Sequence, residues 1–227
     1  LRQRVVAALL EIFVITTRVG VVGIGQNQVN SAAFVDMLGD HAFGNFRALL
    51  EGVTLSTAMG VYLSYRDNQK AEYDGNGVET RVPDENFARE LMQLFSIGLV
   101  QLNADGSPKL KKNLPQDTYT QSDVFNLARV FTGWKVQKPV AGEDDLAQWA
   151  KPMVADPDLH SPEEKAFLGK VIPAGTGPTV SLKRALDTIF EHDNVGPFIG
   201  KQLIQRLVTS NPSAPYVGRV TAAFNDN

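Results

Sequence analysis

The chain has 227 residues, of which 43% are hydrophobic and 21% charged, enough apolar material for one large domain with its own core. Its 22 basic and 25 acidic residues give a net charge of −3 without a basic stripe, which argues against a nucleic-acid partner. The absence of cysteine excludes disulfides, thiolate zinc sites and cysteine nucleophiles. The apolar run Val5–Ile15 is too short to cross a bilayer and contains Glu11.

Helical patterns dominate from the first residue. Leu1–Thr17 carries apolar side chains around nearly the whole circumference, which is typical of a helix buried in a bundle. Val19–Gln26 is rich in glycine but lacks the order of a phosphate or dinucleotide loop, so we expect a buried connector. Asn30 or Ser31 is a suitable cap for a short helix that runs to Leu38.

The next part of the chain is predicted to form two helices and a loop. The helices are Asn45–Leu50 and Leu55–Tyr65, the second with apolar residues at three- and four-residue spacing. Arg66–Arg81 is polar and contains Asp-Gly-Asn-Gly, which indicates a surface loop.

The segment Pro83–Gly98 is the most distinctive predicted helix. Asp84 is a good N-cap, and Gly98 fits the position just beyond the C-terminus. At about 100° per residue, the apolar side chains share one wide arc and the polar ones fill the remainder. The arc consists of Phe87, Ala88, Leu91, Met92, Leu94 and Phe95.

Two predicted elements come after this helix. Val100–Leu102 and Lys109–Lys111 flank an Asn-Ala-Asp-Gly turn, which indicates a small β-hairpin that we expect to act as a surface flap. Thr120 and Asp123 have the spacing of a capping box, with Asp in place of the usual Glu, and predict a central helix that ends at Gly133.

The last part of the chain begins with an irregular excursion over residues 135–180. Within it, Ser161-Pro162 has the pattern of a helix start. Three closing helices are predicted over Leu182–Glu191, Gly196–Thr209 and Pro215–Phe224. We therefore expect an all-α fold, an irregular multi-helix bundle in a single domain over residues 1–227, with a minor hairpin and a long irregular loop. The abrupt helical pattern at both ends predicts a fragment of a longer protein.

Several of these segments together resemble the domain of unknown function 1800 family of bacterial proteins. They are LRQRVVAALLEIFVI, AFGNFRALLEGVTLSTAMGVYLS, PDENFARELMQLFSIGLVQLNADG, YTQSDVFNLARVFTGW and VGPFIGKQLIQRLVTSNPS, so the resemblance covers essentially the whole chain. It implies an exported, mostly helical protein, often encoded beside a secreted family similar to alkaline phosphatases and sulfatases, and it supplies no catalytic residues. Many members carry His-Pro where this chain has Ser56-Thr57.

The polar face of the Pro83–Gly98 helix holds the candidate catalytic residues, Glu90, Arg89 and Asn86. If the hairpin flap covered this face, Glu90 would be a partly buried general base or metal ligand, and Arg89 would bind an anionic substrate. The alternative, which we favour, is a structural network in which Arg129 reaches Glu90 and docks the next helix.

Asp156, Asp158 and His160 lie within five residues and are weak candidates for a metal site. A turn in which the Asp side chains bond local amides explains the pattern better, so we expect no metal and no cofactor. Trp134 and Trp149 flank an irregular segment, and anchoring that segment explains them better than stacking on a sugar.

Three hypotheses for function remain. The leading one is a non-catalytic extracytoplasmic scaffold or interaction module whose partner is another secreted or surface protein. The extracytoplasmic location (periplasm, secreted or cell surface) is implied by the resemblance alone. The alternatives are a hydrolase-like enzyme acting on an extracellular polymer, and a structural subunit of a surface assembly.

Overall fold

The structure is a computed structural model that describes residues 1–16, 24–139, 141–142 and 144–226. Helices dominate these residues, and four pairs of short antiparallel strands accompany them, so the fold is helix-rich but contains more strand pairs than the one minor hairpin expected in an all-α bundle. The helices are α1 (Arg2–Leu10), α2 (Ile24–His41), α3 (Phe46–Leu55), α4 (Thr57–Tyr62), α5 (Asn86–Gln93), α6 (Gln121–Val130), the 3-10 helix η1 (Ala147–Ala150), α7 (Pro178–Phe190), α8 (Val195–Leu207) and α9 (Ala214–Asn225).

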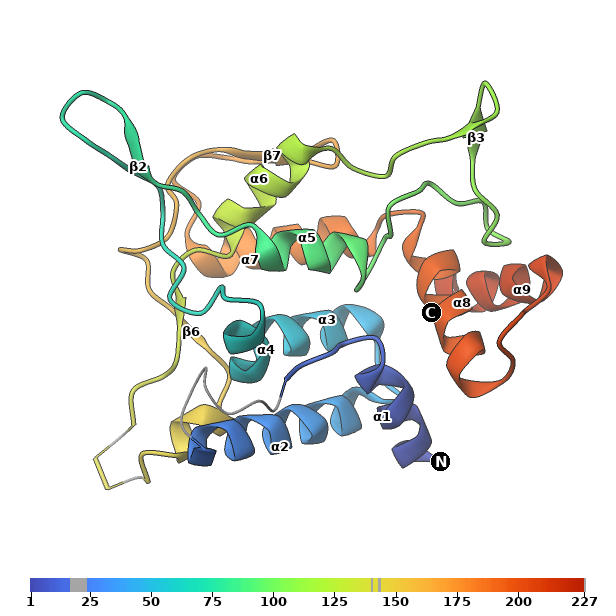
Figure 1. Cartoon of the computed structure of the whole chain (residues 1–227), viewed down its shortest axis with the longest axis horizontal. Coiled ribbons are helices and arrows are strands. Elements are labelled where there is room, and N and C mark those ends of the chain that lie inside the picture. Colours follow the sequence, from blue (N-terminus) through green and yellow to red (C-terminus); the bar gives the residue numbers. More distant parts are fainter. Residues whose placement is uncertain (17–23, 140, 143, 227) are drawn as a thin grey trace.

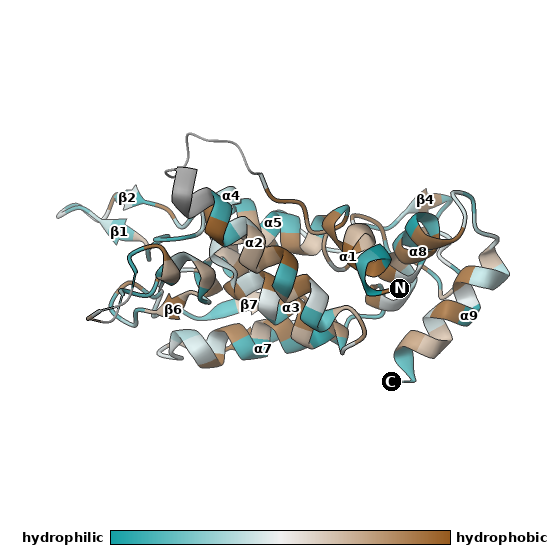
Figure 2. Cartoon of the chain, turned by 90° about the horizontal axis from the view of Figure 1, so that it is seen from below, coloured by the Kyte–Doolittle hydropathy of each residue, from teal (hydrophilic) through white to brown (hydrophobic). Residues whose placement is uncertain are grey.

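The helices form layers (Figure 1). α1 and α2 lie on one side, α3 and α4 lie in the middle, and α5, α6 and α7 lie on the other side, with α8 and α9 packed together at one end. Figure 2 shows apolar residues concentrated along α2, α3 and α7 through the middle of the molecule. An ion pair between Arg47 of α3 and Asp187 of α7, 2.7 Å long, holds two of these layers together.

Three buried aromatic rings form the centre of the core. Tyr65 stacks on Phe87 of α5 with ring centroids 4.0 Å apart, and Phe131 packs edge-on against Phe87 at 4.7 Å. The Tyr65 hydroxyl donates a hydrogen bond to the backbone oxygen of Thr54 in α3. Burial raises the pKa of Tyr65 well above its ordinary value. This aromatic cluster therefore joins α3, α5 and the end of α6.

The capping box predicted for α6 is confirmed, whereas the predicted N-cap of α5 is wrong by one residue. Thr120 and Asp123 form the capping box of α6: the Asp123 carboxylate accepts from the Thr120 amide at 2.7 Å. Glu85 occupies the N-cap position of α5, and Asp84, one residue earlier, still accepts from the Asn86 amide at 2.8 Å. Gly98 has a φ of +72° and its amide donates to the Met92 oxygen at 2.8 Å. α5 itself is shorter than predicted because its last turn loosens after Gln93.

Two predicted helix starts are wrong. Asn30 and Ser31 are not caps, because α2 is continuous from Ile24 and Asn30 is buried within it. The predicted connector Val19–Gln26 lies mostly outside the described residues. Ser161 does not begin a helix either, because its amide donates to the Thr132 hydroxyl at 2.8 Å and the chain continues as a hairpin.

The excursion over residues 135–180 is more ordered than predicted. β5 (Trp134–Lys135) pairs with β6 (Val154–Ala155), and β7 (Lys165–Phe167) pairs with β8 (Lys170–Ile172). The β7–β8 hairpin packs on α6, where the Asp123 carboxylate accepts from the Leu168 amide at 2.8 Å. The polar loop before α5 likewise holds a hairpin, β1 (Glu72–Tyr73) with β2 (Glu79–Arg81).

The predicted flap is a longer arm than expected and extends from residue 99 to residue 118. The expected turn is present, since the Asn103 amide donates to the Ser107 oxygen at 2.8 Å and Leu102 bridges Pro108. Beyond it, β3 (Leu110–Lys111) pairs with β4 (Leu114–Pro115) in a hairpin that projects from the molecule (Figure 1). We name residues 99–118 the arm.

The base of the arm is held by one buried side chain, Asn194, at the start of α8. Its amide nitrogen donates to the oxygens of Ile97 and Val100, both at 2.8 Å, and its oxygen accepts from the Leu102 amide at 2.9 Å. The base is therefore fixed to the body of the protein by a residue that lies far away in the sequence.

Gly133, which follows the end of α6, should not tolerate a side chain. Its φ is +80°, and an added Cβ would lie 2.5 Å from the Asp156 oxygen and 3.0 Å from the His160 nitrogen, both backbone atoms. We expect Gly133→Ala to lower the free energy of unfolding by about 2–4 kcal/mol in urea titrations. Gly75→Ala is the control, because nothing lies within 4 Å of its Cβ position. Equal effects of the two substitutions would contradict this account.

Candidate functional site

The polar face of α5 is mainly a link to α6. Arg89 forms an ion pair with Glu85 at 2.8 Å and donates to the Gln121 side chain at 3.1 Å. Gln121 in turn donates to the same Glu85 carboxylate at 2.7 Å. Arg89 thus takes part in a network of three side chains that joins the start of α5 to the start of α6. In this arrangement it fixes their relative position rather than presenting its guanidinium to a ligand.

Asn86 lies at the exposed start of α5, apart from that network. Its side chain donates to the Ser64 hydroxyl at 3.5 Å, and Ser64 donates to Asp84 at 2.8 Å. Asn68, buried nearby, holds the Asp84 backbone from the other side at 2.9 Å. The contacts of Asn86 therefore belong to the cap of the helix.

Glu90 is the exception on this face. Its side chain is half-buried, and its Oε2 atom is buried without a hydrogen-bond partner in the described part of the chain. Its electrostatic partner is Tyr119, whose hydroxyl donates to Gln93 at 3.5 Å. Burial raises the pKa of Tyr119, Arg89 opposes that rise, and the negative charge of Glu90 adds to it.

The expected pair between Arg129 and Glu90 is wrong. Arg129 instead lies 3.4 Å from Glu163 and over the ring of Phe125, 4.6 Å from its centroid. The physical reason is the packing of the β7–β8 hairpin on α6, which brings Glu163, two residues before β7, to Arg129. Among the described residues Glu90 forms no ion pair, and it lines none of three pockets that lie between the elements.

The three candidate metal ligands, Asp156, Asp158 and His160, do not converge on one site. The Asp156 carboxylate pairs with Lys135, whose hydrogen bond lowers the pKa of Asp156, and it also accepts from the Asp158 amide at 3.1 Å. His160 is buried and turned inward. Over the described ranges, no group of three or more His, Asp or Glu side chains is arranged to hold a metal ion.

His160 binds the end of α6 to α7. Its Nδ1 atom lies 2.9 Å from the Thr132 oxygen, and its Nε2 atom lies 3.2 Å from the Ser181 hydroxyl. A carbonyl only accepts, so Nδ1 carries the proton of the neutral ring and Nε2 is an acceptor. The Ser181 hydroxyl that faces Nε2 also lies 3.2 Å from the Thr176 oxygen, to which it donates, so its single hydrogen has two competing acceptors. This geometry resembles a nucleophile and its base, but His160 is only 4% exposed and Ser181 is fully buried, so no substrate reaches it.

Lys165 is a second buried titratable residue of the same junction, and no local pattern in the sequence indicated it. Its ammonium donates to the backbone oxygens of Ser161 and Glu163, both at 2.9 Å. Burial lowers the pKa of Lys165 to about 8, although the Glu163 carboxylate opposes that change. Both buried groups are therefore occupied in holding the excursion onto α6 and α7.

The two larger of those three pockets lie on either side of His41 at the end of α2. The first, about 480 Å³, lies where α1, α3, α8 and α9 meet, and Phe46 and Phe224 are among its aromatic lining residues. The second, about 440 Å³, lies between α2 and α3 beside η1 and includes Asn30 and Trp149. Sequence reasoning missed both pockets because helical patterns show which residues are apolar but not where two helices leave a space.

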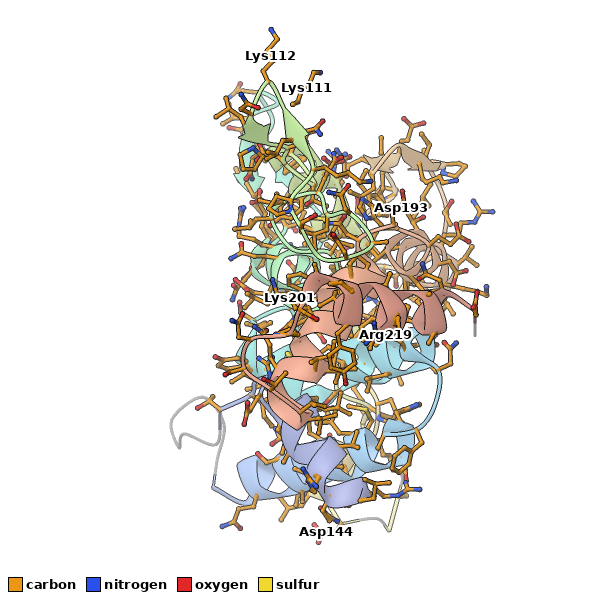
Figure 3. All side chains as sticks on the ribbon, turned by 90° about the vertical axis from the view of Figure 1, so that its right-hand side faces the viewer. Lys111, Lys112, Asp144, Asp193, Lys201 and Arg219 are labelled. Atoms are coloured by element: carbon orange, nitrogen blue, oxygen red, sulfur yellow. The ribbon has the colours of Figure 1, made fainter. Side chains whose placement is uncertain are left out.

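The hairpin of the arm is exposed and projects from the molecule. Figure 3 shows Lys111 and Lys112 at its tip, beyond the other labelled residues. Leu110 and Leu114 on its strands are 58% and 68% exposed. Lys112 and Asn113 have φ of 52° and 65°, which matches a tight hairpin turn. The arm leans toward α8 and α9, whereas the polar face of α5 is linked to α6, so the arm is not the flap over that face that was expected.

Comparison with known proteins gives a family and no activity. The family model described as "Protein of unknown function (DUF1800)" matches residues 1–227, the whole chain, which confirms the resemblance that the sequence showed. No curated protein and no solved structure matches the chain. Among the described residues, no helix is long and apolar enough to cross a membrane.

The buried imidazole of His160 should make the protein sensitive to acid. Burial lowers its pKa from 6.5 to about 4, so the unfolded chain binds a proton at higher pH than the folded chain does. The contribution of His160 to the free energy of unfolding should be fully present above pH 6.5. It should decrease by about 3 kcal/mol in total as the pH drops toward about 4. Urea titrations between pH 7.5 and pH 4 would measure this slope.

His160→Gln removes the titrating group and should flatten that slope, at a constant cost in stability. His192, whose pKa burial also lowers, supplies the control: His192→Gln should retain most of the slope. An unchanged slope in His160→Gln would show that another group controls the acid sensitivity.

Proposed function

Because the chain belongs to the DUF1800 family, whose description assigns no activity, we propose from its geometry that it is a non-catalytic interaction module. The observation that carries this proposal is the arm, which presents leucine and lysine side chains away from the body of the protein. The titratable groups of the α6–α7 junction are buried and used in packing, which suits a binding role better than a catalytic one.

The chemistry of the arm indicates the kind of partner. Lys109, Lys111 and Lys112 lie within four residues, and no acidic residue occurs between Gly106 and Gln116. The chain as a whole is acidic, at −3, so the arm differs in sign from the protein that carries it. A partner surface with carboxylates around an apolar recess would pair with the lysines and bury Leu110 and Leu114.

We further propose that this partner is another secreted or surface protein and that the module works outside the cytoplasm. The support is the family resemblance alone. Fractionation of cells that produce the full natural protein tests the location, and recovery in the cytoplasm alone would contradict it.

A photo-crosslinking amino acid in place of Leu114 should trap the partner in cells that produce both proteins. The same substitution at Val180, which is 49% exposed on α7, provides the matched control and should give no such product. Lys111→Glu with Lys112→Glu should reduce the product at least about tenfold, since charge reversal slows electrostatically guided association. Equal products at both positions, or no effect of charge reversal, would overturn the proposal.

The hydrolase alternative has one observation in its favour, the buried Glu90 oxygen without a partner in the described part of the chain. Under the interaction proposal that oxygen only costs stability, so Glu90→Met should keep the free energy of unfolding unchanged or raise it by up to about 1–3 kcal/mol in urea titrations. A clear loss of stability would show that Glu90 has a structural partner. Cleavage of an extracellular polymer by the wild-type protein and not by Glu90→Gln would instead favour the enzyme.

A further inference from the structure

The pocket between α2 and α3 has the size and walls of a small-molecule site. Its volume of about 440 Å³ lies in the range of about 300–1,000 Å³ that ligand pockets occupy. One stripe of α2 and one stripe of α3 form its sides, and η1 closes it with the indole of Trp149. We name it the α2–α3 pocket; it is separate from the arm, so a ligand bound there is independent of the interaction proposal.

Small side chains create the space in this pocket. Ala33 of α2 and Ala48 and Gly52 of α3 line it where larger residues would fill the gap between the helices. A Cβ at Gly52 would lie 2.8 Å from the Met37 sulfur, so the two helices are in close contact beside the cavity. The apolar lining is completed by the side chain of Leu55.

One wall of the pocket contains an unpaired acceptor. Asn30 is 2% exposed, lines the pocket, and its Oδ1 atom has no hydrogen-bond partner among the described residues. A buried amide oxygen without a donor is costly, and such atoms are rare in folded proteins. Because Asn30 lies within α2 and not at its end, capping does not explain an asparagine here.

Two other polar side chains that line the pocket have partners of their own. The Glu51 carboxylate pairs with Arg47 at 2.7 Å, and the Thr57 hydroxyl donates to the Lys151 oxygen at 2.9 Å. His41 lines the opposite end, about 16 Å from Asn30 along α2 at about 1.5 Å per residue. The pocket is therefore elongated and apolar, with one neutral acceptor near one end that lacks a donor among the described residues.

We propose that the α2–α3 pocket binds an uncharged, elongated apolar molecule with a terminal O–H or N–H group, which donates to Asn30 Oδ1. An aliphatic body matches Met37, Leu55 and Trp149, and a neutral donor supplies the bond that Asn30 lacks within the described chain. A charged head group fits less well, because it would give up its hydration for a single neutral carbonyl.

Two probes of nine heavy atoms test the donor directly: 1-octanol, and 1-methoxyheptane, which has the same atoms but no O–H. Isothermal titration of each into the wild-type protein should show 1-octanol binding about tenfold more tightly, because only the alcohol satisfies the buried oxygen. Equal affinities, or no binding of either probe, would overturn the proposal.

Variants of α2 show whether the probe binds in this pocket. Ala33→Leu places a larger side chain in the pocket and should abolish binding, whereas Ala32→Leu changes the exposed neighbour and should leave the affinity unchanged. Asn30→Leu should bind both probes equally and unfold at no lower urea concentration than wild type. Binding that survives Ala33→Leu in a folded protein would place the site elsewhere and contradict the proposal.

Discussion

The stacked rings of Tyr65 and Phe87 are the contact on which the arrangement of the helices depends. Phe87 is the first apolar residue of α5, Tyr65 comes after α4, and Phe131 closes the cluster from the end of α6. The Tyr65 hydroxyl has to find an acceptor in the core, and it does so at the Thr54 oxygen of α3. The packing of the rings thus sets the distance between α5 and the end of α6, and one hydrogen bond holds Tyr65 against α3.

That constraint also bears on the buried polar residues that gather beside the end of α6. Once α5 and α6 are fixed by the aromatic cluster, the backbone between Thr132 and Trp134 must turn sharply, and Gly133 allows the turn. The backbone oxygen of Thr132 then accepts from His160 Nδ1, and the Thr132 hydroxyl accepts from the Ser161 amide. The histidine and serine side chains at this turn, which could do chemistry elsewhere, are therefore surrounded by packed side chains and not by solvent.

Local features of this fold could be predicted well from the sequence, and long-range ones poorly. Gly98, Gly133 and the Thr120–Asp123 capping box were found because helix ends depend on residues a few positions apart. Asn30 and Ser161 were misassigned because their side-chain type suits a cap, while the contacts that decide their roles come from distant segments. The pairing of Arg129 with Glu163 and the space beside Asn30 depend on how elements pack, which no local pattern encodes.

The anchoring of the arm by Asn194 has a mechanical consequence. A pull on the hairpin is resisted at its base by the three hydrogen bonds of Asn194 to Ile97, Val100 and Leu102. The turn of the arm at Gly106 also lies close to Lys201 of α8 and Val217 of α9. Tension on the hairpin is therefore carried first by the two helices at that end of the molecule, and not by the aromatic cluster at its centre.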